Sequence, residues 1–118
     1  MDPTLARDGW ELESAEERHQ AAPTFGIPSA EERSSLVVGQ KVKLLFLLAV
    51  PGRDGVVQCE KMWVMITEVV EGSYAGILES CPATSNAIEE GARVAFRPEH
   101  VSAVLIPKAD PRHPHYGR

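Results

Sequence analysis

The chain has 118 residues, of which 43% are hydrophobic and 25% are charged, and its formal net charge is −5. This length suits one domain with a single modest core. The longest apolar run covers residues 44–50, whereas a membrane-spanning helix needs roughly 20 apolar residues. We therefore expect one globular domain that does not cross a membrane.

Acidic residues are concentrated in the first third of the chain. Residues 1–35 hold eight acids and three bases, a balance of −5, whereas residues 36–118 hold nine of each, a balance of zero. Phosphate binding requires a basic face, so this distribution argues against a nucleic-acid partner. An acidic segment can attract a basic partner, although a solvated surface is its commoner role.

Residues 1–39 predict an N-terminal head made of helical and extended segments. The pentapeptide SAEER occurs twice, beginning at Ser14 and at Ser29, and each copy has the pattern of a capping box that starts a helix. The first helix must end before Pro23, because proline disfavours helical geometry in the residue before it. Apolar residues beside these helices, Trp10 among them, require burial against the rest of the chain.

Residues 40–106 predict a body of short strands. In chain order we expect a strand over 41–50, a hairpin turn at 51–55, a strand over 60–69, a tight turn at 71–72, strands over 73–79 and 93–97, one helical turn at 98–101 and a last strand over 102–106. This order indicates an α+β, mainly β fold: a small five-stranded SH3-like barrel or a strongly bent antiparallel sheet, with the N-terminal segment packed on it. Residues 107–118 contain three prolines and no apolar periodicity, which predicts a disordered tail.

The strand over residues 60–69 is apolar on both of its faces. One face carries Met62, Val64 and Ile66, and the other carries Trp63, Met65 and Val69. We expect the head to lie across the second face, with Phe25 and Ile27 as the covering residues. An exposed Trp63 would instead be an anchor for a protein partner, because aromatic residues dominate binding hot spots.

Few residues have the pattern of a catalytic or metal site. No nucleophile elbow, phosphate-binding glycine loop or metal-binding cysteine pair is present in the sequence. Glu99 and His100 could supply acid–base chemistry, but adjacent side chains usually point apart, and capping of the turn explains them better. His113 and His115 lack the further ligands that a metal site needs. We therefore expect no cofactor and no metal.

The two cysteines, Cys59 and Cys81, are far apart in the sequence and form no CxxC motif. The first ten residues carry charges and no apolar block, so we expect no secretory signal and a cytoplasmic protein with two reduced thiols. A structural disulfide remains an alternative if the strands that end at these residues are neighbours.

Four segments together resemble a family of small bacterial domains of unknown function. They are FGIPSAEERSSLVVGQKVKLLF (25–46), EKMWVMITEV (60–69), GILESCP (76–82) and EGARVAFRPEHV (90–101). The family pattern joins an iPS-x-x-ER helix start, a GD-x-VKL strand, a MWVE-x-TE strand, a G-x-L-x-x-x-P strand and a G-x-x-V-x-F-x-P-E-H-[IV] ending. The resemblance spans residues 23–106. This chain has Gln40 and Met65 where relatives commonly have acids, and the second difference makes its outer face more apolar.

Some relatives in that family resemble proposed immunity proteins of polymorphic toxin systems, so the resemblance implies a protein that binds and neutralises a toxin. It supplies no catalytic residue. We therefore predict a non-catalytic protein-binding module of a bacterium, a monomer or weak homodimer, whose partner is a protein. The expected interaction surface consists of Trp63, Met65, Glu68, Tyr74, Glu99 and His100.

Two alternatives stay open from the sequence. The first is a small-molecule-binding β-barrel, with the ligand between the head and the sheet near Trp63. The second is an enzyme that uses Glu99 and His100, or Cys59 as a nucleophile.

Overall fold

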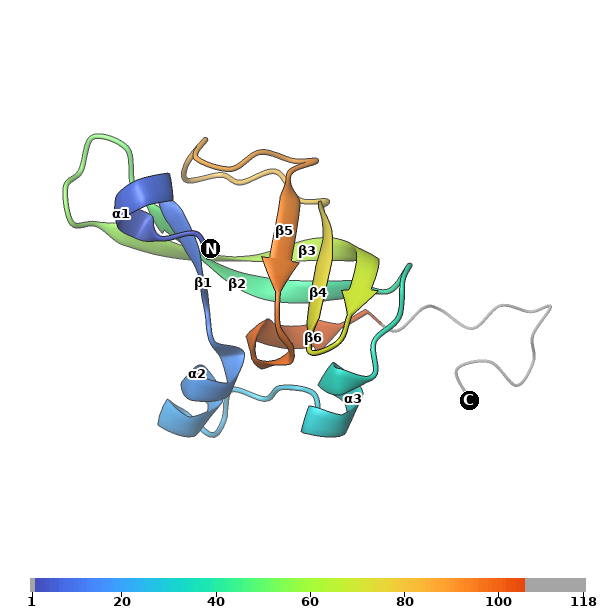
Figure 1. The fold of residues 1–118 in the computed structure, drawn as a ribbon. Coiled ribbons are helices and arrows are strands. Elements are labelled where there is room, and N and C mark those ends of the chain that lie inside the picture. Colours follow the sequence, from blue (N-terminus) through green and yellow to red (C-terminus); the bar gives the residue numbers. More distant parts are fainter. Residues whose placement is uncertain (1, 106–118) are drawn as a thin grey trace, which may run out of the picture.

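The structure is a computed structural model that describes residues 2–105. Strands hold 39% of the residues and helices 18%, which confirms the α+β, mainly β class. The elements are α1 (Leu5–Asp8), β1 (Trp10–Glu13), α2 (Ala15–Ala21), α3 (Ala30–Ser34), β2 (Lys41–Ala49), β3 (Val57–Val70), β4 (Ser73–Leu78), β5 (Arg93–Phe96), the 3-10 turn η1 (Pro98–His100) and β6 (Val101–Val104) (Figure 1).

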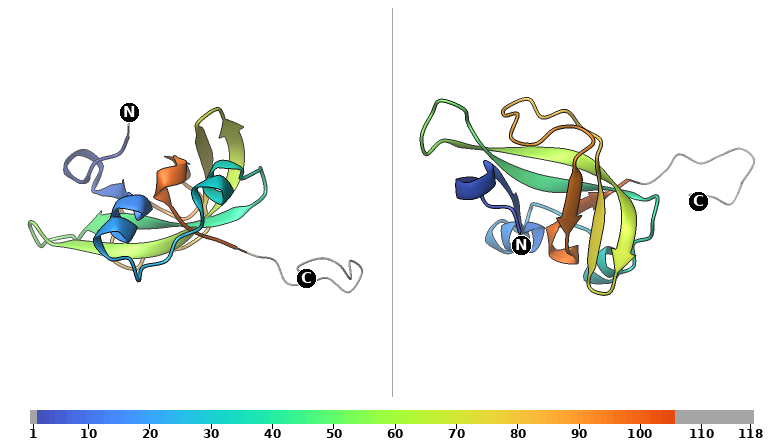
Figure 2. Two further views of the ribbon diagram at one scale, coloured as in Figure 1. Left: turned by 90° about the horizontal axis from the view of Figure 1, so that it is seen from below. Right: turned by 45° about the horizontal axis from the view of Figure 1, so that its top comes forward.

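The strands form one antiparallel sheet with the order β1-β2-β3-β4-β5, and β6 also pairs with β2. β1 lies along residues 45–48 of β2 and β6 lies along residues 42–44. Because β3 occupies the other edge of β2, β1 and β6 share one edge. The sheet curls so that β4 and β5 turn back across it, as Figures 1 and 2 show. The expected strongly bent antiparallel sheet is confirmed, including the helical turn between its last two strands.

The hydrophobic core fills the concave side of this half-barrel. Alternate residues of β2, β3, β4 and β5 point into it, as strand geometry requires. Its buried members are Leu36, Val42, Leu44, Phe46, Leu48, Met62, Val64, Ile66, Tyr74, Leu78, Ile88, Val94, Phe96 and Val101. Trp10 closes part of the core, with its ring centre 5.7 Å from that of Phe46.

One glycine is required by the close approach of β4 to β3. A Cβ atom added at Gly76 would lie 2.2 Å from the carbonyl oxygen of Met65 and 2.7 Å from a methyl group of Val64. Real Cβ atoms do not approach other atoms so closely, so only glycine fits without movement of the strands. Just beyond this point the pairing of β3 with β4 shifts between Ile66 and Glu68, which is the mark of a β-bulge.

Both SAEER segments start helices, as their pattern predicts. The side chains of Ser14 and Ser29 accept hydrogen bonds from the backbone N–H groups of Glu17 and Glu32, each at 3.1 Å. α2 and α3 both contact η1. The head also contains α1 and β1, which the sequence pattern did not predict. Trp10 gains its burial as part of a strand of the sheet, not as part of a covering layer.

Arg33 joins the head to the body. Its side chain is 7% exposed and forms an ion pair with Glu16 of α2. It also donates hydrogen bonds to the carbonyl oxygens of Pro28, at 2.8 Å, and of Pro98 in η1, at 3.2 Å. One buried guanidinium therefore connects α2, α3 and the turn before β6, in the planar arrangement of donors that arginine offers.

Candidate functional site

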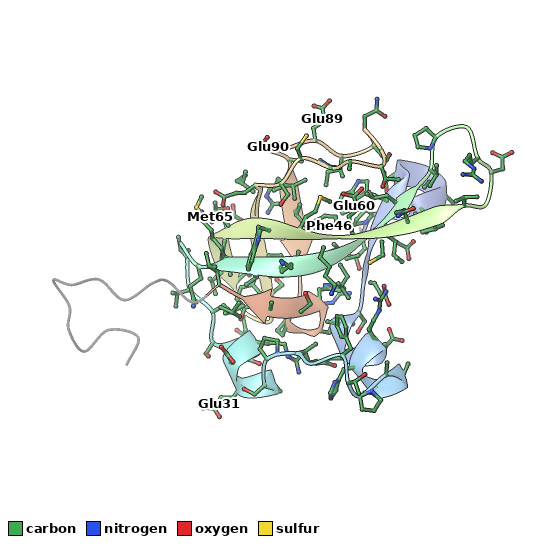
Figure 3. The ribbon with its side chains drawn as sticks, turned by 180° about the vertical axis from the view of Figure 1, so that it is seen from behind. Glu31, Phe46, Glu60, Met65, Glu89 and Glu90 are labelled. Carbon is green, nitrogen blue, oxygen red and sulfur yellow. The ribbon has the colours of Figure 1, made fainter. Side chains whose placement is uncertain are left out.

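Trp63 and Met65 lie on the convex outer face of the sheet, and both are half-buried. Lys43 stands directly opposite Trp63 in the β2–β3 register, and its ammonium nitrogen lies 4.7 Å from the centre of a Trp63 ring, a cation–π geometry. Met65 lies between Lys41 of β2 and Ile77 of β4. Figure 3 shows Met65 on the side of β3 away from α2 and α3.

The head covers only one section of this outer face. Phe25 lies beside Lys61, whose ammonium nitrogen is 4.9 Å from its ring centre. Leu45, which is opposite Lys61 in register and also faces outward, is fully buried. The expectation that Phe25 and Ile27 cover Trp63 therefore differs from the structure, in which the neighbouring strand supplies the cover through Lys43. The long stem of a lysine can shield an apolar ring while its charge stays in water.

Glu68 and Tyr74 have separate environments. The β-bulge turns Glu68 away from the core, and its carboxylate pairs with Arg93 of β5 at 3.0 Å on the exposed outer face. Tyr74 is buried, and its ring stacks on Phe96 with centres 5.3 Å apart. The Tyr74 hydroxyl donates to the carbonyl oxygen of Arg33 at 2.8 Å. Tyr74 therefore holds the end of α3 on the sheet.

Glu99 and His100 both belong to η1, where they make separate contacts. The Glu99 carboxylate pairs with the Arg97 guanidinium at 3.0 Å. His100 is buried, and its Nδ1 atom accepts a hydrogen bond from the backbone N–H of Arg97 at 3.0 Å. Burial first, and then the charge of Arg97, lower the pKa of His100 below its usual value. His100 thus caps the turn in its neutral form.

Cys59 and Cys81 are both exposed free thiols. Cys59 lies near two charged side chains, Arg18 at 3.8 Å and Glu13 at 4.0 Å. Partial burial is the largest influence on this thiol and raises its pKa, against the opposing effect of Arg18. A raised pKa reduces the fraction of thiolate, which is the nucleophilic form. This environment does not activate Cys59.

The predicted interaction residues therefore do not form one site. Trp63, Met65 and Glu68 lie on the outer face, Tyr74 lies in the core, and Glu99 and His100 belong to η1. Within residues 2–105, no group of three or more histidine, cysteine or acidic side chains could hold a metal ion. His113 and His115 lie outside the described residues. None of the helices in residues 2–105 has the length and apolar character to cross a membrane.

A different surface is more apolar, and we call it the valine cluster: Val37, Val38, Val69 and Val70. These side chains are between 49% and 61% exposed. The first two belong to the loop before β2, where the N–H of Gly39 donates to the carbonyl oxygen of Ile66 at 2.8 Å. That bond places the loop beside the end of β3, which carries the other two valines (Figure 1).

A shallow groove of about 290 Å³ adjoins the valine cluster. It lies between the β3–β4 hairpin and the junction of α3 with η1. Its lining consists of Ser34, Val69, Val70, Glu71, Gly72, Ser73, Tyr74 and Pro98. The lining holds one acid, Glu71, and no basic residue. Glu31 and Glu32 are exposed on α3 outside this lining. The groove is therefore mainly apolar, with one acid in its lining.

The sequence contains a signal for the valine cluster. Val37-Val38 and Val69-Val70 are adjacent pairs next to a glycine or a turn. Adjacent side chains of an extended segment point in opposite directions, so one valine of each pair must lie away from the core unless a second layer covers it. In this fold both members of each pair are exposed.

The chain was compared with family models, with curated proteins and with solved structures, and none of them matches it.

Proposed function

We propose that this chain is a non-catalytic protein-binding module and that the valine cluster is its binding surface. The observation that carries the proposal is the exposure of Val69 and Val70, which line the groove, next to the loop that exposes Val37 and Val38. Contiguous exposed apolar patches on a folded protein mark interaction sites. Burial of the remaining exposed area would contribute roughly 1 kcal/mol per valine.

The chemistry of the groove and its surroundings defines the partner. Glu71 lines the groove, and α3, which lines it through Ser34, also carries Glu31 and Glu32. A partner that presents an apolar side chain flanked by lysine or arginine residues complements this surface in both respects. Such electrostatic complementarity accelerates association and selects among partners. The net negative charge of residues 1–35 also favours a basic partner.

The partner class follows from the family resemblance. Immunity proteins neutralise a toxin by covering it, which requires a stable surface and no catalytic group. We propose this role for the chain, with a basic toxin as the partner.

A growth assay tests this role. The chain is expressed in cells together with the product of each neighbouring gene, and survival is compared for the native chain and the Val70→Asp variant. We expect the native chain to restore growth against one such product and the variant to fail. Val57→Asp, which changes an exposed valine at the far end of β3, is the matched control and should still protect. Protection by Val70→Asp equal to that of the native chain would refute the valine cluster as the binding surface.

A further inference from the structure

β1 and β5 are the two ends of the sheet, and the curl of the sheet turns them toward each other. In Figure 1 both strands run downward on the same side of the molecule. Within residues 2–105, β1 pairs only with β2 and β5 pairs only with β4. Among the described residues, no strand pairing joins β1 to β5. Each strand therefore presents an unpaired edge to the space between them, which we call the β1–β5 slot.

The register shows which backbone groups face this slot. In antiparallel pairs, residues with hydrogen bonds to the partner strand alternate with residues whose N–H and C=O groups point away. Ala49 donates to the carbonyl oxygen of Gly9, and Leu78 donates to that of Ala92, each at 2.9 Å. Gly9 therefore faces β2, and so do the residues two and four positions after it. The backbone N–H and C=O groups of Trp10 and Leu12 point away from β2, toward the slot.

The same alternation places the outward groups of β5 at Arg93 and Ala95. Each edge therefore offers two residues, spaced two apart, whose donors and acceptors are available to another strand. An extended peptide has this same spacing of donors and acceptors, which is the basis of binding by strand addition. A strand placed against either edge would meet unpaired donors and acceptors.

Two adjoining cavities show that the slot is open. One has a volume of about 210 Å³ and is lined by Leu12, Ala95, Arg97 and His100, among others. The other has a volume of about 260 Å³ and is lined by Trp10, Arg93 and Ala95, among others. Ala95 lines both cavities, so they follow the edge of β5 from one end to the other. Its small side chain leaves room for a neighbouring backbone.

The N-terminal segment indicates what the slot accepts. Pro3 lines both cavities, and the Asp2 carboxylate pairs with the Arg97 guanidinium at 3.2 Å across the slot. Asp2 itself remains 70% exposed, and the segment forms no strand pairing with β1 or β5. Arg97 thus binds two carboxylates, those of Glu99 and of Asp2, and the second comes from the segment before α1. A peptide that brings its own carboxylate and also pairs with the strand edges would bind better.

We propose that the β1–β5 slot binds an extended segment of a partner protein, as an added strand whose acidic side chain replaces Asp2 on Arg97. This site is distinct from the groove beside the valine cluster, because the two have no lining residue in common. It does not depend on the function proposed above. Backbone pairing supplies the affinity, and Arg97 selects segments that carry a carboxylate.

Peptide selection tests the proposal. A displayed library of random eight-residue peptides is selected on the immobilised full chain, and the most enriched peptide is synthesised with a fluorescent label. We expect enriched peptides to carry an aspartate or glutamate. In two-dimensional ¹H–¹⁵N spectra of the chain, the bound peptide should shift the backbone amide signals of Trp10, Leu12, Arg93 and Ala95 and protect them from hydrogen exchange. No enrichment above background, or shifts confined to another surface, would overturn the proposal.

The second test measures the affinity of variants of the chain for the selected peptide. Ala95→Pro removes an outward N–H at an edge where proline is tolerated, and it should weaken peptide binding at least tenfold. Asp2→Ala should strengthen it by about two- to fivefold, because it removes a competing exposed ion pair. Val57→Asp is the control and should leave the affinity unchanged. Unchanged affinity in Ala95→Pro would contradict strand addition, and the amide protection measured on the native chain decides the matter if that variant fails to fold.

Discussion

Lys43 holds its ammonium group 4.7 Å from the centre of a Trp63 ring, and the two residues are direct cross-strand partners on the outer face of the sheet. The residue that covers Trp63 is therefore a lysine of the adjacent strand. Because both side chains remain partly exposed, their interaction can be measured without disturbing the core.

A double-mutant cycle with Lys43→Met and Trp63→Leu should show this interaction. We expect a coupling energy of about 0.5–1 kcal/mol in the free energy of unfolding, measured by chemical denaturation. Lys41→Met is the matched control, because Lys41 pairs with Glu79 at 2.9 Å. Its coupling to Trp63→Leu should be close to zero. Equal coupling for both lysines would mean that the cation–π contact contributes nothing.

Gly76→Ala should destabilise the fold by about 2–3 kcal/mol, because the new methyl group would collide with the backbone of β3. Gly26→Ala is the control, since no atom lies within 4 Å of a Cβ added there. Its free energy of unfolding should change by less than about 0.5 kcal/mol. Thermal or chemical unfolding of both variants checks the prediction, and similar losses in the two would contradict it.

Arg33→Met should cost about 2–3 kcal/mol of stability, because it removes a buried donor from the carbonyl oxygens of Pro28 and Pro98. The same change at Arg53, in the exposed hairpin of residues 51–56, should have little effect. Hydrogen exchange provides a second readout, in which the amides of α2 and α3 should lose protection before those of β2. A variant that retains full stability would show that Arg33 does not hold the head.

Stability should fall as the pH decreases below 6.5, because His100 must stay neutral to accept the hydrogen bond from Arg97. Its folded-state pKa is lowered by burial and then by the charge of Arg97, while Glu99 and Asp2 oppose that shift. The unfolded chain therefore binds the proton at a higher pH than the folded chain, and protonation favours unfolding.

His100→Asn keeps an acceptor for the Arg97 amide and removes the titration. Denaturation at pH 7, 6 and 5 should show a smaller loss of stability in this variant than in the native chain. An identical pH dependence in the two proteins would show that His100 does not account for it.

The local features of this fold are readable from the sequence. Ser14 and Ser29 mark helix starts because a capping serine acts on the backbone only three residues away. The turn at Gly72 and the strand over Lys41–Ala49 depend on similarly short-range patterns. β1 was missed although Trp10 and Leu12 alternate with acids, because four residues are too few for a period-two pattern to stand out beside the helix signal at Ser14.

Features that depend on pairing between distant residues could not be predicted from the sequence. The cover of Trp63 is set by its register with Lys43, which aligns residues on different strands. The valine cluster arises because the loop after α3 lies beside the end of β3 through the bond between Gly39 and Ile66. Each valine pair is visible in the sequence, but their proximity is a property of the folded chain. The same holds for the slot between β1 and β5.

The most direct test measures how tightly the purified chain binds the toxin that the growth assay identifies. Calorimetry gives this affinity for the native chain and for two valine variants. We predict that Val70→Asp weakens binding by at least a hundredfold, since a charge in a buried apolar contact must be desolvated without a partner. Val57→Asp should bind as the native chain does. Unchanged affinity in Val70→Asp, in a variant that remains folded, would contradict the assignment of the valine cluster as the binding surface.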